Sequence, residues 1–260
     1  MGVAAAPVLH FLHLLLRYCL RVPKPECIEL PGVEPIPILY EDRSVLAIDK
    51  PRGWMLVPTS WQRTQRNLQA AVTSSIAARD FWARSRGLKY LRYIHRLDAD
   101  TSGILLFAKS QGALEAFSAL FEGRRMQKTY LAVVRGRPKQ NEWTCRLALA
   151  PHPKETGKMK GDSRGKNAET FFRSIHIGAY ATLLEAQPIT GRTHQIRVHL
   201  AEAGLPIVGD ELYGRLGDSA NLGLRAVGLD YTDPFSRRSV RIRAPIDSFC
   251  SEYGFETPPL

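Results

Sequence analysis

A segment with four charged side chains leads directly into an uninterrupted apolar run, and this junction constrains the fold more than any other feature of the chain. The apolar run Ile104–Ala108 follows a Ser-Gly turn and predicts a buried strand. The charges just before it are those of His95, Arg96, Asp98 and Asp100. Charges at the mouth of a core strand lose hydration, which is costly unless they are paired. Clustering alone favours a network of ion pairs that fixes the loop.

The rest of the chain alternates strand and helix patterns. Strands are predicted at Ile36–Tyr40, Val45–Asp49, Lys128–Val134, Cys145–Leu149, Thr170–Ile177, Ala181–Pro188, Leu224–Tyr231 and Ser239–Ala244. Helices are predicted at Leu68–Ile76 after an N-cap at Thr64, at Leu114–Phe121 between caps at Ser110 and Gly123, and at His194–Ala203 between Thr193 and Gly204. Many strands joined by hairpins predict an α+β fold, a single domain on a largely antiparallel mixed sheet with flanking helices.

The first 35 residues differ from the rest and are expected to form an N-terminal extension and a proline-rich lead-in to a domain at 36–260. The apolar run Val8–Leu16 is too short to cross a bilayer and lacks the charged start of a secretory signal. Arg17 and Arg21 leave an organelle-targeting peptide open, but a helical or poorly ordered extension is favoured. No membrane association is expected.

The composition favours a polyanionic partner and argues against several kinds of site. Lys and Arg number 36 against 25 Asp and Glu, a net charge of +11 that suits nucleic acid. No GxGxxG, P-loop, HExxH or CxxC motif occurs, so neither a nucleotide cofactor nor a metal site is expected. The widely spaced cysteines predict a reducing, cytoplasmic compartment. Residues 151–168 are rich in Lys, Arg and His and predict a mobile loop that contacts phosphates or is a solvated charged surface.

One arginine of the third predicted helix calls for a carboxylate partner. Arg197 lies one turn inside this helix, beside the core-facing Ile196 and Leu200. A buried arginine needs an acid nearby, and Asp98 is the candidate. The pairing would keep Asp98 ionised by lowering its pKa. An ionised carboxylate in a basic pocket is either structural or a nucleophile, and the residues alone do not decide between these roles.

Four segments also carry a resemblance to a known family: Lys50–Gly53, His95–Gly103, Lys128–Ala132 and Gly191–His199 with its continuation Pro206–Gly214. Together they resemble the pseudouridine synthases, specifically the large ribosomal-subunit branch, over about residues 36–245. The segment His-Arg-Leu-Asp-x-x-Thr-Ser-Gly is present without a departure, while Asp49 stands where asparagine is more usual.

The resemblance implies isomerisation of specific uridines in RNA, either rRNA or tRNA, to pseudouridine, without cofactor or metal. Asp98 matches the catalytic aspartate, which attacks the ribose or the base or removes a proton from the sugar. Tyr130 matches the tyrosine that stacks on the flipped-out base. Arg197 matches the basic residue that pairs with the aspartate, in agreement with the inference from burial.

Four further residues are candidates for substrate binding by the same resemblance. Arg96 is expected near the space that the flipped base leaves, and Arg192 is a candidate phosphate contact. Lys50 either contacts RNA or fixes its own turn. His95 is a candidate too, although it and Asp100 are expected to hold the loop together rather than to touch substrate.

Many relatives in the family carry a small N-terminal RNA-binding domain of the S4 type. The 35 proline-rich residues are too few for one, so none is expected, and RNA affinity would come from the basic surface that includes residues 151–168. A monomer is expected. Two other functions stay open: an RNA-binding or assembly factor that needs no catalysis, and a glycosidase. A glycosidase needs two opposed carboxylates, and Asp98 and Asp100 are too close in sequence to face each other.

Overall fold

The computed structural model describes residues 23–30, 32–56, 66–214 and 220–259. The predicted apolar run of the N-terminal extension, Arg17, Arg21 and Thr64 lie outside these ranges. The strands of the large sheet are β1 (Cys27–Ile28), β2 (Ile36–Glu41), β3 (Val45–Lys50), β4 (Arg92–Tyr93), β5 (Ser102–Ala108), β6 (Gln127–Arg135), β7 (Glu142–Cys145), β10 (Thr170–Ile177), β11 (Ala181–Pro188), β12 (Leu224–Thr232) and β13 (Ser239–Arg243). A separate two-stranded sheet consists of β8 (Leu149–Pro151) and β9 (Met159–Gly161), and the helices are α2 (Leu68–Ala77), α3 (Phe81–Arg84), α4 (Gln111–Glu122), α5 (Gln195–Glu202) and α6 (Asp247–Glu252).

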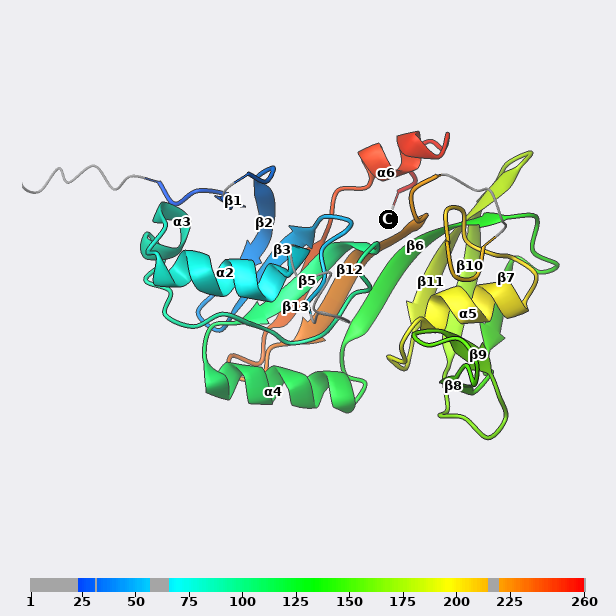
Figure 1. Cartoon of the computed structure of the whole chain (residues 1–260), viewed down its shortest axis with the longest axis horizontal. Coiled ribbons are helices and arrows are strands. Elements are labelled where there is room, and N and C mark those ends of the chain that lie inside the picture. Colours follow the sequence, from blue (N-terminus) through cyan, green and yellow to red (C-terminus); the bar gives the residue numbers. More distant parts are fainter. Residues whose placement is uncertain (1–22, 31, 57–65, 215–219, 260) are drawn as a thin grey trace, which may run out of the picture.

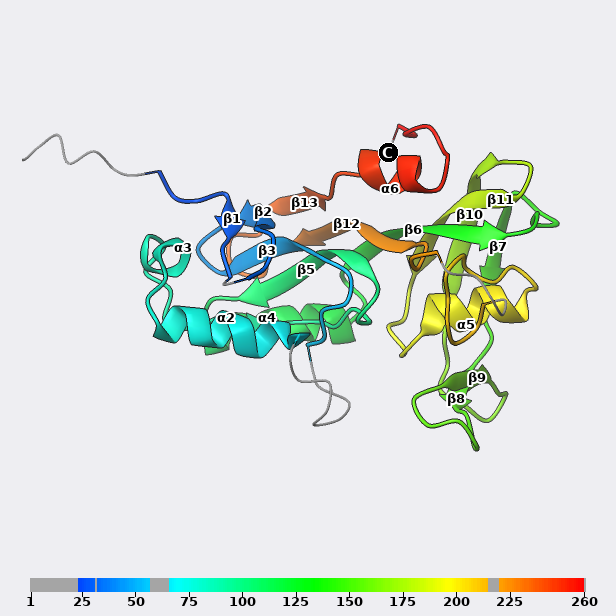
Figure 2. The same ribbon diagram turned by 45° about the horizontal axis from the view of Figure 1, so that its top comes forward.

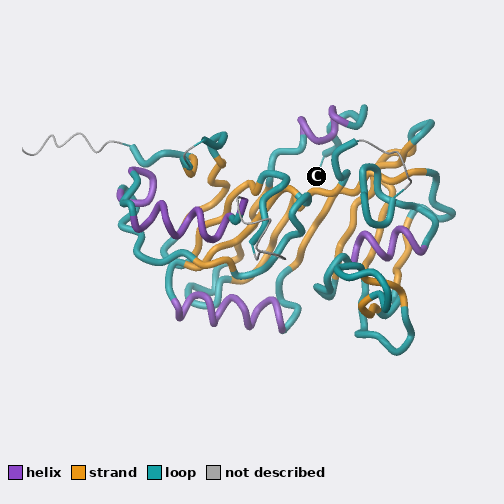
Figure 3. Tube along the Cα trace, viewed as in Figure 1, coloured by secondary structure: helices purple, strands orange, loops and turns teal. Residues whose placement is uncertain are grey.

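The large sheet runs through the molecule in the order β1-β2-β3-β5-β12-β6-β11-β10-β7, with β13 on β12 and β4 on β5 (Figure 1). The strands form one continuous band between the helices (Figure 3). Its strand pairs are antiparallel except for β5 and β12, which are parallel. The predicted α+β fold on a largely antiparallel mixed sheet is therefore confirmed.

The central strands are buried on both faces, which explains why β5 reads as an uninterrupted apolar run. Leu105 of β5 packs in a cluster with Leu68 of α2, whereas its neighbour Leu106 packs in a cluster with Phe117 of α4. Successive side chains of a strand point to opposite faces, so α2 and α4 cover opposite faces of this half of the sheet. In the other half α5 packs on Ala132 and α6 on the opposite face of β6.

The predicted caps of α4 and the end of α5 before Gly204 are confirmed, whereas the N-caps of α2 and α5 differ from the prediction. Ser110 accepts a hydrogen bond from the Ala113 N–H at 3.2 Å, as an N-cap should. The N-cap of α2 is Asn67, whose side chain is bonded to the Ala70 N–H. The predicted cap at Thr193 is wrong, because α5 begins after His194, which holds a left-handed backbone with φ of 54° and makes no side-chain cap.

The predicted strand Cys145–Leu149 is wrong, because β7 ends at Cys145 and β8 starts at Leu149. Between them the Leu147 carbonyl is bonded to His199 of α5 at 3.0 Å rather than to a neighbouring strand. The predicted mobile loop 151–168 instead contains β9, which pairs with β8 and packs against α5. This β8–β9 hairpin projects beyond α5 (Figure 2).

Residues of the proline-rich lead-in already belong to the packed structure. Strand β1 pairs with β2, and the side chain of Ile28 is fully buried in the core around α2. The packing therefore begins before the predicted boundary at residue 36. None of the helices in the described ranges combines the length and apolar character needed to span a bilayer.

Substitution of Gly103 tests how closely β5 and β12 pack where they pair. Its φ is +108°, and a Cβ there would meet the Ala226 carbonyl of the neighbouring strand. Gly103→Ala should lower the free energy of unfolding, measured in urea, by about 3 kcal/mol through overpacking and backbone strain. Gly112 in α4 has open space around it, so Gly112→Ala should leave stability unchanged or raise it by up to about 1 kcal/mol. Equal effects of the two substitutions would contradict this account.

Candidate active site

Asp98 lies in the loop between β4 and β5, with its side chain 27% exposed. Lys50 of β3 is fully buried beneath this loop. Its ammonium donates to the carbonyls of Ala99 at 2.7 Å, Thr101 at 2.9 Å and Pro51 at 3.0 Å. Burial lowers the pKa of Lys50 to about 7, although Asp100 and Asp98 act to raise it. These three hydrogen bonds agree with the fixation of its turn, one of the two roles predicted for Lys50.

Arg197 projects from α5 to Asp98, and the predicted pairing is confirmed. Its Nη1 lies 3.1 Å from Asp98 Oδ2. The closer partner is Asp210, whose two carboxylate oxygens accept from Arg197 Nε at 2.8 Å and Nη2 at 2.7 Å. Burial alone would lower the pKa of Arg197, but Asp210 and Asp98 outweigh burial and hold the pKa above its ordinary value.

The main partner of Arg197 is Asp210, which the sequence did not indicate as a site residue. Its side chain is fully buried and also accepts the backbone N–H groups of Leu212 and Tyr213 at 3.0 Å. Burial would raise the pKa of Asp210, but the contact with Arg197 outweighs burial and holds the pKa below its ordinary value. The available signal was an acid in the segment Pro206–Gly214, which the resemblance had already singled out.

The two oxygens of Asp98 have different surroundings. Oδ2 faces Arg197 and, at 3.8 Å, the Nε2 of His194. Among the described residues no hydrogen bond is made to Oδ1. One oxygen is thus held in place while the other is open to a bound molecule. His194 was not among the predicted site residues, although it lies in the segment Gly191–His199.

Tyr130 lies on β6, on the face of the sheet that α2 and α5 share. It pairs with Ala186 of β11 and Ala226 of β12 and packs against the clusters of both halves of the sheet. Burial, with a smaller contribution from Asp98, raises the pKa of the Tyr130 phenol. The phenol is therefore neutral at physiological pH and offers an aromatic face.

The remaining predicted site residues, Arg96, Arg192 and His95, differ in exposure and in their contacts. Arg96 is exposed, and Arg192 is half-buried with its Nε donating to the Asn167 carbonyl at 3.0 Å. His95 accepts the Leu106 N–H at 3.2 Å and stacks on Phe121 of α4 at 4.7 Å. Burial and then Lys128 lower the pKa of His95 to about 3, so that it is neutral and holds the loop to α4.

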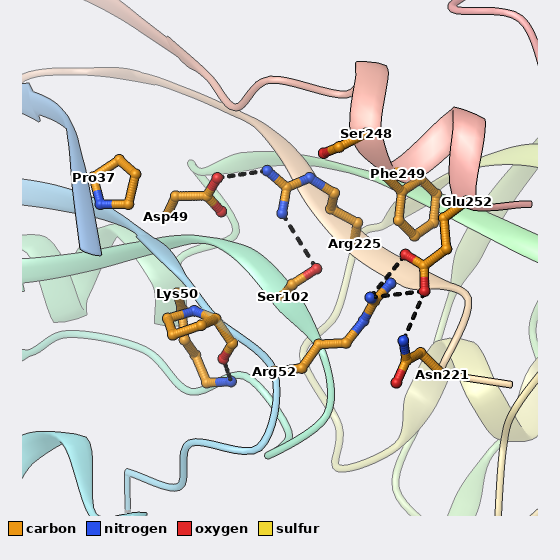
Figure 4. Close-up of a pocket in the computed structure, with 11 residues that line it drawn as sticks. Pro37, Asp49, Lys50, Arg52, Ser102, Asn221, Arg225, Ser248, Phe249 and Glu252 are labelled. Atoms are coloured by element: carbon orange, nitrogen blue, oxygen red, sulfur yellow. Dashed lines mark hydrogen bonds and ion pairs between the residues drawn. The ribbon is translucent and has the colours of Figure 1, made fainter. Parts of the chain in front are cut away.

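A hollow of about 460 Å³ lies on the other side of β3 and β5, next to α6 (Figure 4). Asp49 points into it and pairs with Arg225 of β12 at 2.6 Å, and Arg225 also donates to Ser102 at 3.2 Å. Lys50, the next residue after Asp49, also lines this hollow, although its ammonium is bonded to carbonyls of the Asp98 loop. None of Asp98, Tyr130 and Arg197 lines this hollow, so it is separate from the candidate active site. Within the described ranges no group of three or more His, Cys, Asp or Glu residues could hold a metal ion.

The fold and the site define a protein with an arginine-held aspartate beside a tyrosine on an extended mixed sheet, and comparison with known proteins identifies its family. The family model described as RNA pseudouridylate synthase matches residues 44–202, more than half of the chain. The chain therefore belongs to the RNA pseudouridylate synthase family, as the resemblance predicted. The matched residues include Asp98, Tyr130 and Arg197.

Curated relatives agree with this assignment. The chain is 36% identical over 222 residues to ribosomal large subunit pseudouridine synthase C of Escherichia coli (strain K12) and 38% identical over 224 residues to that of Yersinia pestis. Each match covers 81% of this chain and 66% of the relative, so the chain spans just under two thirds of the length of these relatives.

Solved structures show the same fold. The human RNA pseudouridylate synthase domain containing 1 matches with a TM-score of 0.68 and 26% identity, over 86% of this chain and 90% of that chain. The human RNA pseudouridylate synthase domain containing 4 also matches with a TM-score of 0.68, at 21% identity, over 85% of this chain and 94% of that chain.

Asp210→Asn tests whether the buried carboxylate supports the arginine. The substitution removes the main counter-charge of a buried guanidinium, so it should lower the free energy of unfolding by about 3 kcal/mol. The control is Glu211→Gln, because Glu211 is the adjacent acid and is exposed. It should change the free energy of unfolding by less than about 0.5 kcal/mol. Urea unfolding of both variants measures the difference, and an Asp210→Asn variant as stable as the control would refute the assigned role.

Proposed function

We propose that this protein isomerises uridine to pseudouridine in RNA. The observation that carries the proposal is the asymmetry of Asp98: Arg197 holds Oδ2 at 3.1 Å, Oδ1 accepts no hydrogen bond from the described residues, and Asp98 is near enough to Tyr130 to raise the pKa of its phenol. Membership of the RNA pseudouridylate synthase family supports it independently.

The reaction breaks the N1–C1′ bond of uridine and forms a bond between C5 and C1′. The proton on C5 is lost and N1 gains one, so the product is an isomer of the substrate. A base inside an RNA helix must leave the stack to react, and the ring of Tyr130 offers it an aromatic platform. Asp98 then acts through Oδ1, either by attack on the ribose or base or by removal of a proton from the sugar. Arg197 supplies the counter-charge that holds the carboxylate in place for each route.

RNA is the proposed partner, and the basic surface of the β8–β9 hairpin is its proposed contact. The hairpin and its flanks carry exposed cations, Lys154, Arg164 and Lys166 among them. Arg96 is also exposed and is proposed to enter the space that the base leaves. Arg192 is proposed to contact a phosphate. The names of the curated relatives favour an RNA of the large ribosomal subunit, with tRNA as the alternative. A cytoplasmic location and a monomeric state remain predictions.

Asp98→Asn tests the catalytic assignment. With RNA that carries tritium at C5 of uridine, the wild-type protein should release tritium from rRNA or tRNA, and the variant should release it at least ~10³-fold more slowly. Affinity for RNA should stay within about threefold, because one charge among many is lost. Asp100→Asn, in the same loop but exposed, should keep most of the activity.

Two outcomes would count against the proposal. Absence of tritium release by the wild-type protein from any rRNA or tRNA would refute isomerase activity. Rescue of a deletion strain by Asp98→Asn would instead favour an RNA-binding or assembly factor that does not need catalysis.

The hairpin contact predicts a change in salt dependence. If Lys154 and Lys166 each contact one phosphate, the double alanine variant should bind RNA more weakly at low salt. The slope of log affinity against log salt should fall by about 1.4 to 1.8. Arg137 and Lys139, which are exposed in the loop between β6 and β7, provide a control of equal charge. Equal losses of slope in the two double variants would remove the hairpin from the RNA interface.

A further inference from the structure

A chain of polar contacts connects the β8–β9 hairpin to Asp98. The backbone N–H of Met159 in β9 donates to the Tyr213 hydroxyl at 2.7 Å. The same hydroxyl lies 2.9 Å from His194 Nδ1, and His194 Nε2 lies 3.8 Å from Asp98 Oδ2. These contacts join four segments that are separated in sequence, and of the four residues only Asp98 has a role in the proposed reaction.

The hydrogen bonds of Tyr213 are compatible with one position of the His194 proton in particular. A tyrosine hydroxyl has one proton to donate and lone pairs to accept with. Met159 uses the hydroxyl oxygen as an acceptor, and the nearest acceptor for its proton is His194 Nδ1. A neutral imidazole that accepts at Nδ1 carries its proton at Nε2.

The surroundings of His194 favour the neutral ring that this arrangement needs. Burial lowers the pKa of His194, Arg197 lowers it further, and these outweigh the opposite effect of Asp98 and Asp210. The side chain is only 13% exposed, and its ring meets that of Tyr213 edge to face with centroids 5.6 Å apart. The imidazole is thus held against Tyr213 by both a polar and a ring contact.

The backbone at His194 has a conformation that few residues other than glycine adopt. Its φ of 54° is in the left-handed region, where asparagine, aspartate and histidine are the most frequent of the other residues. Strained backbone persists where the surrounding structure enforces it, and it is concentrated at functional sites. The strain here places the imidazole between Tyr213 and Asp98.

We propose that His194 is a positioning residue in its Nε2–H tautomer, which helps Arg197 to hold Oδ2 of Asp98 so that Oδ1 meets the substrate. At 3.8 Å the N–H attracts the carboxylate without a full hydrogen bond, and an approach of about 0.9 Å would complete one. Tyr213 and the Met159 N–H set the tautomer, so the hairpin that is proposed to bind RNA also orients the reactive group. The inference rests on the proposed role of Asp98.

The tautomer can be measured without any assay of activity. Nitrogen-15 spectra of the imidazole rings at pH 7 distinguish the Nε2–H form, the Nδ1–H form and the imidazolium, and loss of a signal in His194→Asn assigns it. The wild-type protein should show the Nε2–H form. In Tyr213→Phe the ring should shift toward a mixture of forms, because the donor to Nδ1 is gone. An Nδ1–H form or an imidazolium in the wild-type protein would overturn the proposal.

Kinetics test whether the proton positions Asp98. His194→Asn suits the left-handed backbone and keeps an acceptor for Tyr213, but it removes the N–H that faces Asp98. The His194→Asn protein should fold normally. Its kcat for tritium release should fall about 10- to 100-fold, the range that is typical for groups that orient a reactive ligand. Its KM for RNA should stay within about twofold of the wild-type value. His194→Gln can place an N–H near the position of Nε2 and should recover part of kcat.

A control variant and distinct outcomes separate the positioning role of His194 from the proposed isomerase activity. Tyr180→Phe removes a hydroxyl from a tyrosine that is 87% exposed in the turn between β10 and β11, and it should leave kcat and KM unchanged. An unchanged kcat in a folded His194→Asn protein, or an effect on KM alone, would refute the positioning role. If the wild-type protein were inactive on every RNA, the proposed function would fail, while the nitrogen-15 measurement would still decide the tautomer.

Discussion

The ion triad Asp210–Arg197–Asp98 is the interaction on which the site depends. A guanidinium in a buried position is stable only with its charge compensated and its donors bonded. Asp210 provides both through two hydrogen bonds, and two backbone N–H groups hold Asp210 in turn. Because Arg197 is fixed in this way, its third nitrogen, Nη1, can hold the partly exposed Asp98 from a segment 99 residues away in sequence. The fold thus provides a rigid counter-charge on one side of the Asp98 carboxylate.

The loop that carries Asp98 is held from both faces of the sheet. On one face Lys50 binds the carbonyls of Ala99 and Thr101, the residues on either side of Asp100. On the other face the preceding residue, Asp49, pairs with Arg225, which also binds Ser102 at the start of β5. Consecutive residues of one strand point to opposite faces, so β3 secures β5 at two points with two adjacent side chains. The geometry of Asp98 is therefore built into the centre of the sheet.

The far half of the sheet contributes the other parts of the site. Helix α5 supplies Arg197, and the residue before it supplies the imidazole beside Asp98. The β8–β9 hairpin packs on α5 and contacts the site through Tyr213. With the proposed RNA contact of this hairpin and the proposed role of His194, these contacts are a physical route that would link RNA binding to chemistry.

Much of this arrangement could be predicted from the sequence. Strands β5, β6, β10 and β11 follow from apolar and β-branched runs, and the caps of α4 follow from Ser110 and Gly123, because each depends on neighbours in the chain. The Arg197–Asp98 pair followed from the cost of burying a lone guanidinium. The motifs identified the family and Asp98 within it.

Only the tertiary structure decided which partners these residues meet. It made Asp210 the principal partner of Arg197, buried Lys50 under the Asp98 loop, turned His95 toward α4 and ordered the hairpin within residues 151–168. It also moved the start of α5 past Thr193 and divided the predicted strand at Cys145–Leu149. The reason is that local propensity depends on adjacent residues, whereas charge pairing depends on distances between segments far apart in sequence. A sequence shows that a buried charge needs a partner, and the fold selects which partner is near enough.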